Sequence, residues 1–173
     1  MNNLTKLILR RKSVRRFANG SISDLEVKTL IRAAMAAPTA KNAQPWHFVV
    51  VENREVLESL AAQLPYAKML SSATLAIVVC GDLQVHTGES AQNWMLDCAA
   101  ATQNLLLAAE SMNLGAVWTA CYPYKDRVGA VREALALPEH IMPLNIIPIG
   151  ASLGNERPLD KWKPERIHYE RWG

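Results

Sequence analysis

Hydrophobic residues recur along this chain at two periods, and the change of period separates expected helices from expected strands. Apolar positions at helical spacing predict helices over residues 3–9, 24–37, 54–64, 90–113 and 125–135. Continuous apolar runs predict buried strands over residues 46–51, 74–80, 116–120 and 141–149. Because helices and strands intermingle without a repeat or a low-complexity linker, we expect a single domain over residues 1–173 that contains both.

Residues that cap or break helices mark several boundaries. Ser23-x-x-Glu26 is a capping-box pattern, and Pro38 ends the helix that follows it. Asn53 is suited to cap the next helix. Gly115 is suited to the left-handed residue after the helix at 90–113.

Two elements show where they belong in the fold. The helix over 90–113 is rich in alanine and apolar on nearly every side, so we expect it to be enclosed as the central helix of the core. The strand over 141–149 contains Pro143 and Pro148, which lack the N–H that a ladder needs. We therefore expect this strand at an edge of the sheet or at a bulge.

Composition narrows the class of protein. Of 173 residues, 50% are hydrophobic and 20% are charged, with a net charge of +3, which is typical of one globular domain. A dedicated nucleic-acid binder usually carries a larger positive excess. Cys80, Cys98 and Cys121 are odd in number and widely spaced, which argues against a disulfide framework and a zinc site.

The first residues of the chain and the lengths of its apolar runs indicate in which cellular compartment the protein works. Residues 1–9 are too short and too polar for a signal peptide. No apolar run reaches the ~18–20 residues of a membrane span. We expect a cytoplasmic protein that does not act at a membrane.

The basic run at residues 10–16 is the densest chemical feature, with five cations in seven residues and a hydroxyl at Ser13. Guanidinium groups bind phosphate oxygens in bidentate fashion, and a serine hydroxyl adds one more hydrogen bond. Two other interpretations stay open. The run can be a solvated helix end, favoured by roughly 0.3–1 kcal/mol, or a nucleic-acid contact with steep salt dependence.

Several familiar catalytic motifs are missing from the sequence. It has no G-x-G-x-x-G, P-loop, H-E-x-x-H or G-x-S-x-G motif. We interpret the scattered histidines His47, His86, His140 and His168 as surface or packing residues. Such a lack of acid–base machinery is typical of enzymes that leave the chemistry to a bound cofactor.

Three segments occur in a specific order: R-x-S-x-R at residues 11–15, A-P-T-x-x-N-x-Q-P-W at residues 37–46, and H-Y-x-R-W at residues 168–172. Together with the alanine-rich helix, this order resembles the FMN-dependent nitroreductase family over the whole chain. The resemblance implies a three-layer α+β sandwich with a central mixed or antiparallel sheet and flanking helices. It also implies an intertwined homodimer with one FMN per subunit in a groove at the interface.

The resemblance also implies which residues contact FMN. Arg11, Ser13 and Arg15 would hold the phosphate and the nearby flavin edge, Lys12 occupies a motif position from which a side chain can approach the phosphate, and Lys161 is the matching cation of the tail. The residues expected around the flavin ring are Pro38, Thr39, Asn42, Gln44, Lys68, Ala120 and Cys121. Cys121 is equally interpretable as a small buried residue.

Two departures from the family pattern affect this assignment. Relatives often carry two cations two residues apart in the tail, but the earlier position here is Leu159, with Arg157 nearby. The chain is also shorter than many relatives, so it has little sequence for a lid. The single basic cluster suits the one phosphate of FMN, and no second cluster is apparent for FAD.

The implied function is that of an FMN-dependent oxidoreductase. Hydride would pass from NADH or NADPH through flavin N5 to a nitroaromatic, quinone or similar conjugated acceptor, with ping-pong kinetics. A fixed cation, Arg15 or Lys68, would stabilise charge on the reduced flavin, and no side chain is expected to act as a catalytic residue. The alternative is a homodimer that binds or stores FMN without turnover. Residues 151–173 end in aromatic residues, and we expect this tail to pack on the partner subunit.

Overall fold

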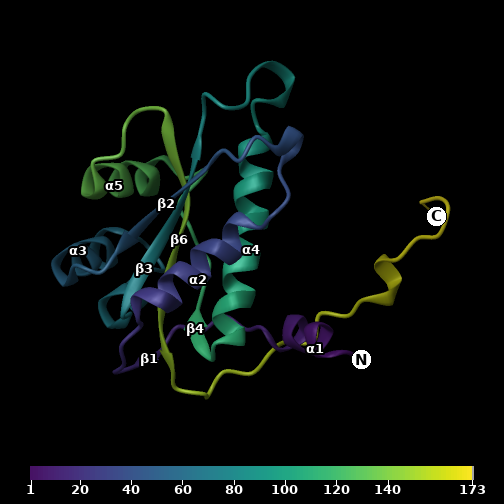
Figure 1. The fold of residues 1–173 in the computed structure, drawn as a ribbon, viewed down its shortest axis with the longest axis horizontal. Helices are drawn as coiled ribbons and strands as arrows, with labels where there is room; N and C mark the ends of the chain where they lie inside the picture. The colour runs from purple at the N-terminus through teal and green to yellow at the C-terminus, as the bar shows by residue number, and fades with distance from the viewer. Residues whose placement is uncertain (173) are drawn as a thin grey trace.

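The computed structural model describes residues 1–172 and shows a sheet between two layers of helices (Figure 1). Helices α2 (Asp24–Met35) and α4 (Asn93–Ser111) cover one face of the sheet. Helices α3 (Arg54–Gln63) and α5 (Lys125–Leu135) cover the other face. This arrangement confirms the expected three-layer α+β sandwich.

Within residues 1–172, six strands form one sheet in the order β1-β6-β3-β2, and β4 and β5 also pair with β6. Every pairing is antiparallel. The strands are β1 (Phe17–Ala18), β2 (Trp46–Val51), β3 (Leu75–Asp82), β4 (Leu114–Ala116), β5 (Thr119–Ala120) and β6 (Ile141–Ser152). The expected strand over 116–120 is therefore two short strands, and the first of them begins earlier.

The expectation of an edge position for β6 is wrong, because β6 is the strand with which β1, β3, β4 and β5 all pair. The expected bulge is present: Asn145 faces Val79 and Pro143 faces Cys80, which leaves Leu144 as the extra residue. Pro148 is tolerated because it lies outside the β6 residues that pair with β4 and β5. A missing N–H at that point removes no bond to these two strands.

Strand β3 shows how the sequence fills both faces of the sheet. Its odd-numbered residues Leu75, Ile77 and Val79 pack under α2 and α4. Its even-numbered residues pack under α3 and α5. Side chains alternate between the faces of a strand, so a strand buried on both sides has a continuous apolar run.

The predicted capping signals operate at two helices. The hydroxyl of Ser23 accepts the N–H of Glu26, and the Glu26 carboxylate accepts the N–H of Ser23 at 2.7 Å, which completes the capping box of α2. The side chain of Asn53 accepts the N–H of Val56 at 3.2 Å and caps α3.

The end of α4 differs from the prediction. The residue with left-handed backbone is Asn113, with a φ of 57°, and not Gly115. Asparagine tolerates this conformation. Gly115 lies in β4, where a Cβ would come within 2.6 Å of Val14 Cγ1. The glycine is therefore needed for close packing and not for its backbone freedom.

Helix α4 packs against the sheet and α2, but Leu96 is 70% exposed and Gln103 is exposed, so the single chain does not enclose the helix as its apolar sequence predicts. Two buried carboxylates mark its ends. Asp97 lies near its start and Glu110 in its last turn. At 1.5 Å per residue, the thirteen steps from Asp97 to Glu110 span about 20 Å along the helix axis. The two ends of α4 therefore support two separate regions of the protein surface.

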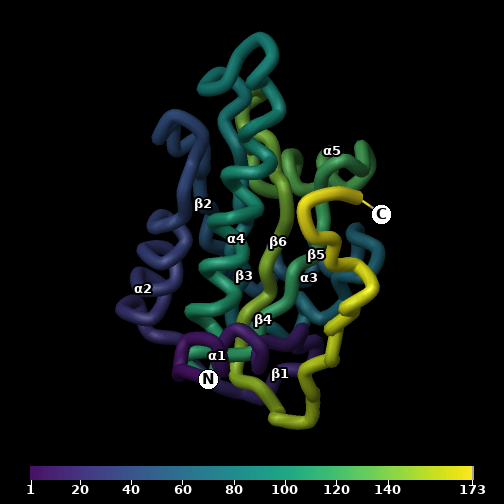
Figure 2. Tube along the Cα trace, turned by 90° about the vertical axis from the view of Figure 1, so that its right-hand side faces the viewer, coloured from purple at the N-terminus to yellow at the C-terminus, as the bar shows by residue number. Residues whose placement is uncertain are grey.

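The N-terminal helix α1 (Asn3–Arg10) and the C-terminal tail both project away from the sheet (Figures 1 and 2). β6 continues to Ser152, so the tail begins at residue 153 and not at 151 as expected. It carries the short 3-10 helix η4 (Pro164–Arg166). Trp162, Tyr169 and Trp172 are 70%, 84% and 89% exposed in the single chain.

Candidate functional site

A groove of about 920 Å³ lies between the segment that follows α1 and the first part of the tail. Its walls include five residues that the sequence assigned to the FMN phosphate: Arg11, Lys12, Ser13, Arg15 and Lys161. Glu156, Arg157 and Leu159 also line it. The structure thus brings the two distant basic segments of the sequence together in one place.

The segment after α1 divides its side chains between the protein body and the groove. Side chains alternate in direction along an extended chain. In this segment Lys12 contacts Glu110 and Val14 is buried. Arg10, the last residue of α1, reaches the same carboxylate. Arg11 and Ser13 occupy the alternate positions and line the groove. Among residues 1–172, the side chains of Arg11, Ser13, Arg15 and Lys161 have no hydrogen-bond or ion-pair partner, so they are available to an anion.

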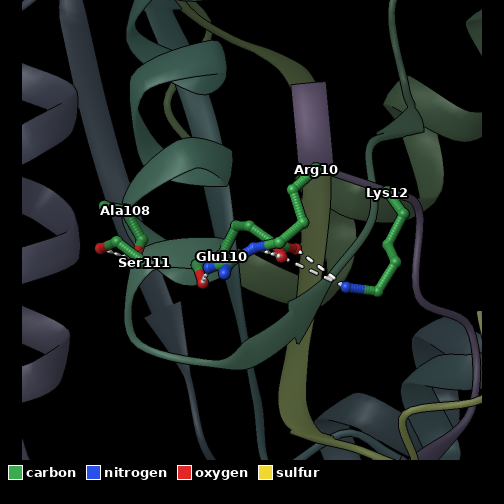
Figure 3. Close-up of polar contacts among 5 residues, drawn as sticks. All are labelled: Arg10, Lys12, Ala108, Glu110 and Ser111. Carbon is green, nitrogen blue, oxygen red and sulfur yellow. Dashed lines mark hydrogen bonds and ion pairs between the residues drawn. The ribbon is translucent and has the colours of Figure 1, made fainter. Parts of the chain in front are cut away.

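Glu110 binds two cations of the basic run at once (Figure 3). Its Oε1 lies 2.9 Å from Arg10 Nε, and both of its carboxylate oxygens lie 3.2 Å from Lys12 Nζ. The ammonium of Lys12 is therefore opposed by a carboxylate, unlike the charges of Arg11 and Arg15. Sequence reasoning missed Glu110, although an acidic residue in an otherwise apolar helix is a signal of a buried pair.

Strand β4 fastens the same segment from the other side. The N–H of Val14 donates to the carbonyl of Ala116 at 3.0 Å. The Val14 side chain packs directly over Gly115, which has no side chain to displace it. The position of Ser13 and Arg15 is thus fixed by the residue between them.

A second cavity of about 480 Å³ is lined by Arg15, Tyr66, Lys68 and Met69. Lys68 begins the short 3-10 helix η2 (Lys68–Ser72). Arg15 lines both cavities, so they adjoin at this residue. The structure therefore places Lys68 next to the basic groove.

The loop at residues 37–46, which is predicted to bind the flavin ring, lies away from both cavities of its own chain. The N–H of Ala40, in the short 3-10 helix η1 (Ala40–Asn42), donates to Asp97 Oδ1 at 3.0 Å. Pro38, Thr39, Asn42 and Gln44 line neither cavity. Because Asp97 and Glu110 lie about 20 Å apart along α4, one chain holds the phosphate groove and the loop at opposite ends of that helix.

Internal contacts give the loop a defined shape. Lys41, Asn42 and Gln44 have φ values of 56°, 54° and 49°, in the left-handed region. The hydroxyl of Thr39 accepts the N–H of Gln44 at 3.2 Å, and Gln44 Nε2 donates to Asn42 Oδ1 at 3.0 Å. The loop is exposed at Asn42 and Gln44, so it presents amide groups to a ligand or to another chain.

The histidines fit their interpretation as packing or surface residues. His86 is buried, and its Nε2 lies 2.9 Å from Asp97 Oδ2. His47 is exposed, and His168 stacks on Trp172 with ring centroids 4.1 Å apart. Among residues 1–172, no three metal-binding side chains gather closely enough to hold an ion.

Ala120 and Cys121 lie at the end of β5. The Cys121 side chain is fully buried in the core under α3 and α5, and this burial raises the pKa of its thiol to about 12. The carbonyl of Ala120 accepts a hydrogen bond from Arg127 Nη1 at 3.2 Å. For the Cys121 side chain, the structure favours the interpretation as a small core residue.

The groove carries side chains that can donate hydrogen bonds to a phosphate. Two unpartnered guanidiniums, a hydroxyl and an ammonium line it, which is the donor set that binds a phosphate dianion. The carboxylates of Glu156 and Asp160 line the same groove. In the part of the chain that the structure describes, no helix is long and apolar enough to cross a bilayer.

Comparisons with known proteins identify the family of this chain. The nitroreductase family model matches residues 8–64 and 58–151. A candidate NADH dehydrogenase/NAD(P)H nitroreductase of Methanothermobacter thermautotrophicus is 39% identical, over 98% of this chain and 88% of its own. The crystal structure of a like-named Parabacteroides distasonis protein has a TM-score of 0.95 at 49% identity, covering 99% of this chain and 100% of the other.

A candidate nitroreductase from Desulfovibrio desulfuricans, solved in complex with FMN, has a TM-score of 0.85 at 28% identity, covering 100% of this chain and 99% of the other. The family model alone matches most of the chain. The identification made from the sequence motifs is thereby confirmed: the chain belongs to the nitroreductase family.

Proposed function

We propose that two copies of this chain form an FMN-dependent oxidoreductase that transfers hydride from NADH or NADPH to a nitroaromatic, quinone or similar conjugated acceptor. The observation that carries the proposal is the groove of unpartnered cations at Arg11, Arg15 and Lys161. The FMN bound to the Desulfovibrio desulfuricans relative supports the cofactor. The name of the Methanothermobacter thermautotrophicus relative supports a nicotinamide donor.

The basic groove would hold the FMN phosphate. Arg11 and Arg15 would supply bidentate donors, with the Ser13 hydroxyl and the Lys161 ammonium completing the set. Lys12 would act less directly, because its ammonium is engaged by Glu110. Leu159 lines the groove as an apolar residue, so Lys161 would be the principal cation of the tail there.

The cavity at Lys68 would hold one edge of the flavin ring. FMN, when bound, supplies the hydride chemistry, and the protein supplies placement and charge. Arg15 and Lys68 would direct positive charge to the ring edge that becomes electron-rich on reduction. Fixed cations in such a site stabilise that charge without reorganising solvent.

A homodimer would bring the two halves of the site together. Pro38, Thr39, Asn42 and Gln44 lie on a loop that one chain holds away from its own groove, so the loop of a second chain would cover the ring. The exposed Trp162, Tyr169 and Trp172 would pack on that second chain. In this arrangement residues 1–173 act as a single domain whose tail reaches the partner subunit.

The state of the three cysteine thiols indicates the cellular compartment of the protein. Cys80, Cys98 and Cys121 are free and buried. Unpaired cysteines fit a reducing compartment, so we place the protein in the cytoplasm, which cell fractionation would check.

Binding of nucleic acid by the basic run is less well supported. Arg10 and Lys12 both pair with Glu110, so part of the positive charge of the run is offset. The charges left exposed form a compact site for one phosphate rather than a stripe for a strand. No observation favours an FMN-storage dimer specifically, but the same experiment separates it from the enzyme.

Anaerobic stopped-flow spectroscopy of the FMN-loaded protein tests the proposal. We expect NADH or NADPH to bleach the visible flavin absorption, and added quinone to restore it. Parallel lines in double-reciprocal plots would support ping-pong kinetics. Protein that binds FMN but is bleached by neither donor would be a storage protein, and protein that takes up no FMN would overturn the proposal.

A further inference from the structure

Glu110 is a buried acidic residue beside a site that should bind an anion. Its side chain is 9% exposed, and it lies in the last turn of α4, where it contacts Arg10 and Lys12. Arg10 Nη2 also donates to the backbone carbonyl of Glu110 at 3.4 Å. A buried carboxylate is destabilising unless it is paired, and both of these cations pair with it.

These contacts fix the direction of the residues that lie between them. Arg10 and Lys12 flank Arg11 in sequence, and both are drawn to the same carboxylate (Figure 3). Arg10 ends α1, Arg11 caps that helix, and the side chain of Arg11 lines the groove. Lys12 and the buried Val14 constrain Ser13 in the same way.

Glu110 also limits which cations meet the ligand. The ammonium of Lys12 lies 3.2 Å from both oxygens of Glu110, so its charge is opposed by that carboxylate although the residue also lines the groove. Two cations and one carboxylate leave one net positive charge, so Glu110 does not reverse the field near the groove. The anion therefore meets Arg11 and Ser13 in a fixed orientation.

We propose that Glu110 is a positioning residue for the phosphate subsite: it binds Arg10 and Lys12 so that Arg11 and Ser13 face the groove. This inference rests on the proposed function, because it assumes that the groove binds the FMN phosphate. Glu110 itself makes no contact with the ligand in this account.

Calorimetric titration of apoprotein with FMN and with riboflavin tests the proposal, because riboflavin lacks the phosphate. In Glu110→Gln the charge is lost while the shape is kept. We expect FMN affinity to fall about tenfold, equivalent to about 1.4 kcal/mol, and riboflavin affinity to stay unchanged. Glu133→Gln, at an exposed position of α5, is the matched control and should change neither affinity.

Two outcomes would overturn the role of Glu110. An equal loss of FMN and riboflavin affinity would mean that the residue is only structural. A gain in FMN affinity would mean that Lys12, once released, binds the phosphate itself. An Arg10→Gln variant covers the case in which Glu110→Gln fails to fold, because Arg10 pairs with Glu110 but does not line the groove, and it should show the same FMN-specific loss. If both fold, the double variant should be no weaker than either single one, because the two residues act as a unit.

Hydrogen–deuterium exchange separates this inference from the proposed function. In apoprotein, exchange over residues 11–16 should be faster in Glu110→Gln than in the wild type. Unchanged exchange would overturn the positioning role whether or not FMN binds. Another outcome is that the wild-type protein binds no FMN while exchange over residues 11–16 is still faster in Glu110→Gln. That result would overturn the proposed function and the phosphate role, and it would leave the contact with Glu110 as a structural one.

Discussion

Asp97 and His86 form a buried pair, with Asp97 Oδ2 lying 2.9 Å from His86 Nε2. The other oxygen of the same carboxylate accepts the N–H of Ala40 at 3.0 Å. One side chain near the start of α4 therefore fastens both the predicted ring-binding loop and the segment that carries His86. Asp97 binds two distant segments near the start of α4, and Glu110 binds the basic run near its end.

Replacing His86 should destabilise the protein. In His86→Ala, Asp97 Oδ2 loses its partner while it remains buried, and such a loss costs about 1–3 kcal/mol. Urea denaturation would measure the decrease in the free energy of unfolding. His47→Ala, at an exposed position, is the control and should be nearly neutral; equal losses in the two variants would contradict the importance of the pair.

Removing both groove arginines should weaken FMN binding strongly. Each hydrogen bond to a charged group contributes about 1.5–3 kcal/mol, so Arg11→Ala with Arg15→Ala should lower the affinity about 100-fold or more. Quenching of flavin fluorescence on titration would measure it. Arg32→Ala on the exposed face of α2 is a suitable control.

Arg54 would be a poor control in that experiment. Its guanidinium donates to the backbone carbonyls of Leu70 and Ser71 at 3.3 Å and 2.8 Å, next to Lys68 in η2. Titration curves that coincide for the double variant and for Arg32→Ala would contradict the assignment of the groove.

A side chain at position 115 should displace Val14 and, with it, the groove residues Ser13 and Arg15 on either side. The added Cβ of Gly115→Ala would come within 2.6 Å of Val14 Cγ1, and overpacking of this kind typically costs about 1–3 kcal/mol. We expect a lower melting temperature together with weaker FMN binding. A second substitution, Val14→Ala, should recover part of both losses by making room.

Gly129→Ala provides the comparison for Gly115→Ala. Gly129 lies inside α5, and a Cβ there meets no atom within 4 Å. Alanine is the better helix former by up to about 1 kcal/mol, so this variant should be neutral or slightly more stable. A Gly115→Ala protein that behaves like Gly129→Ala would show that Val14 is not packed as described.

The cysteines should be inert in the native protein. Burial raises the pKa of the Cys80, Cys98 and Cys121 thiols from 9.0 to about 12. Because the thiolate is the reactive form, a thiol reagent at pH 8 should label the native protein slowly and the urea-unfolded protein fast. Rapid labelling of the native protein would contradict their burial.

The same shift in pKa sets the effect of alkaline pH on stability. The native thiols keep their protons while unfolded thiols lose theirs above about pH 9, so the unfolded state binds fewer protons in this range. The contribution of the thiols to stability is fully present below pH 9 and is lost as pH rises toward 12. Substituting Cys98 by Ala should make the decline in unfolding free energy less steep; an identical slope would contradict the assignment.

Truncation after Gly154 tests the role of the tail. Removing residues 155–173 takes away Trp162, Tyr169 and Trp172, which we propose to pack on a second chain, and also removes Lys161 from the groove. Sedimentation velocity should show a dimer for the full chain and an unstable monomer for the truncated one. An unchanged sedimentation profile would end this part of the account.

The sequence predicted those parts of the fold that depend on local chemistry. The period of apolar residues located the helices and the long strands, and Ser23, Glu26 and Asn53 marked helix starts because capping involves residues only three apart. The edge position that the sequence allowed for β6 is wrong. Pro148 shows only that one N–H is missing, and this does not decide whether the strand has neighbours on both sides. The structure shows that β4 and β5 simply leave a gap there.

In the candidate site, too, the sequence predicted the residues that act locally and missed those that act through distant contacts. The R-x-S-x-R motif located the basic groove because its donors lie within a few residues of one another. Glu110 and Asp97 escaped notice because each acts on a segment far away in sequence, through contacts that only packing creates. Likewise, Gly115 resembled a helix end, although its role is to leave room for Val14.

A crystal structure of the protein with FMN tests the central claim most directly. We predict one FMN per chain, with its phosphate in the groove between Arg11, Ser13, Arg15 and Lys161 and its ring against the loop at residues 38–45 of the second copy. A groove filled only by solvent, with FMN bound elsewhere or not at all, would contradict the account.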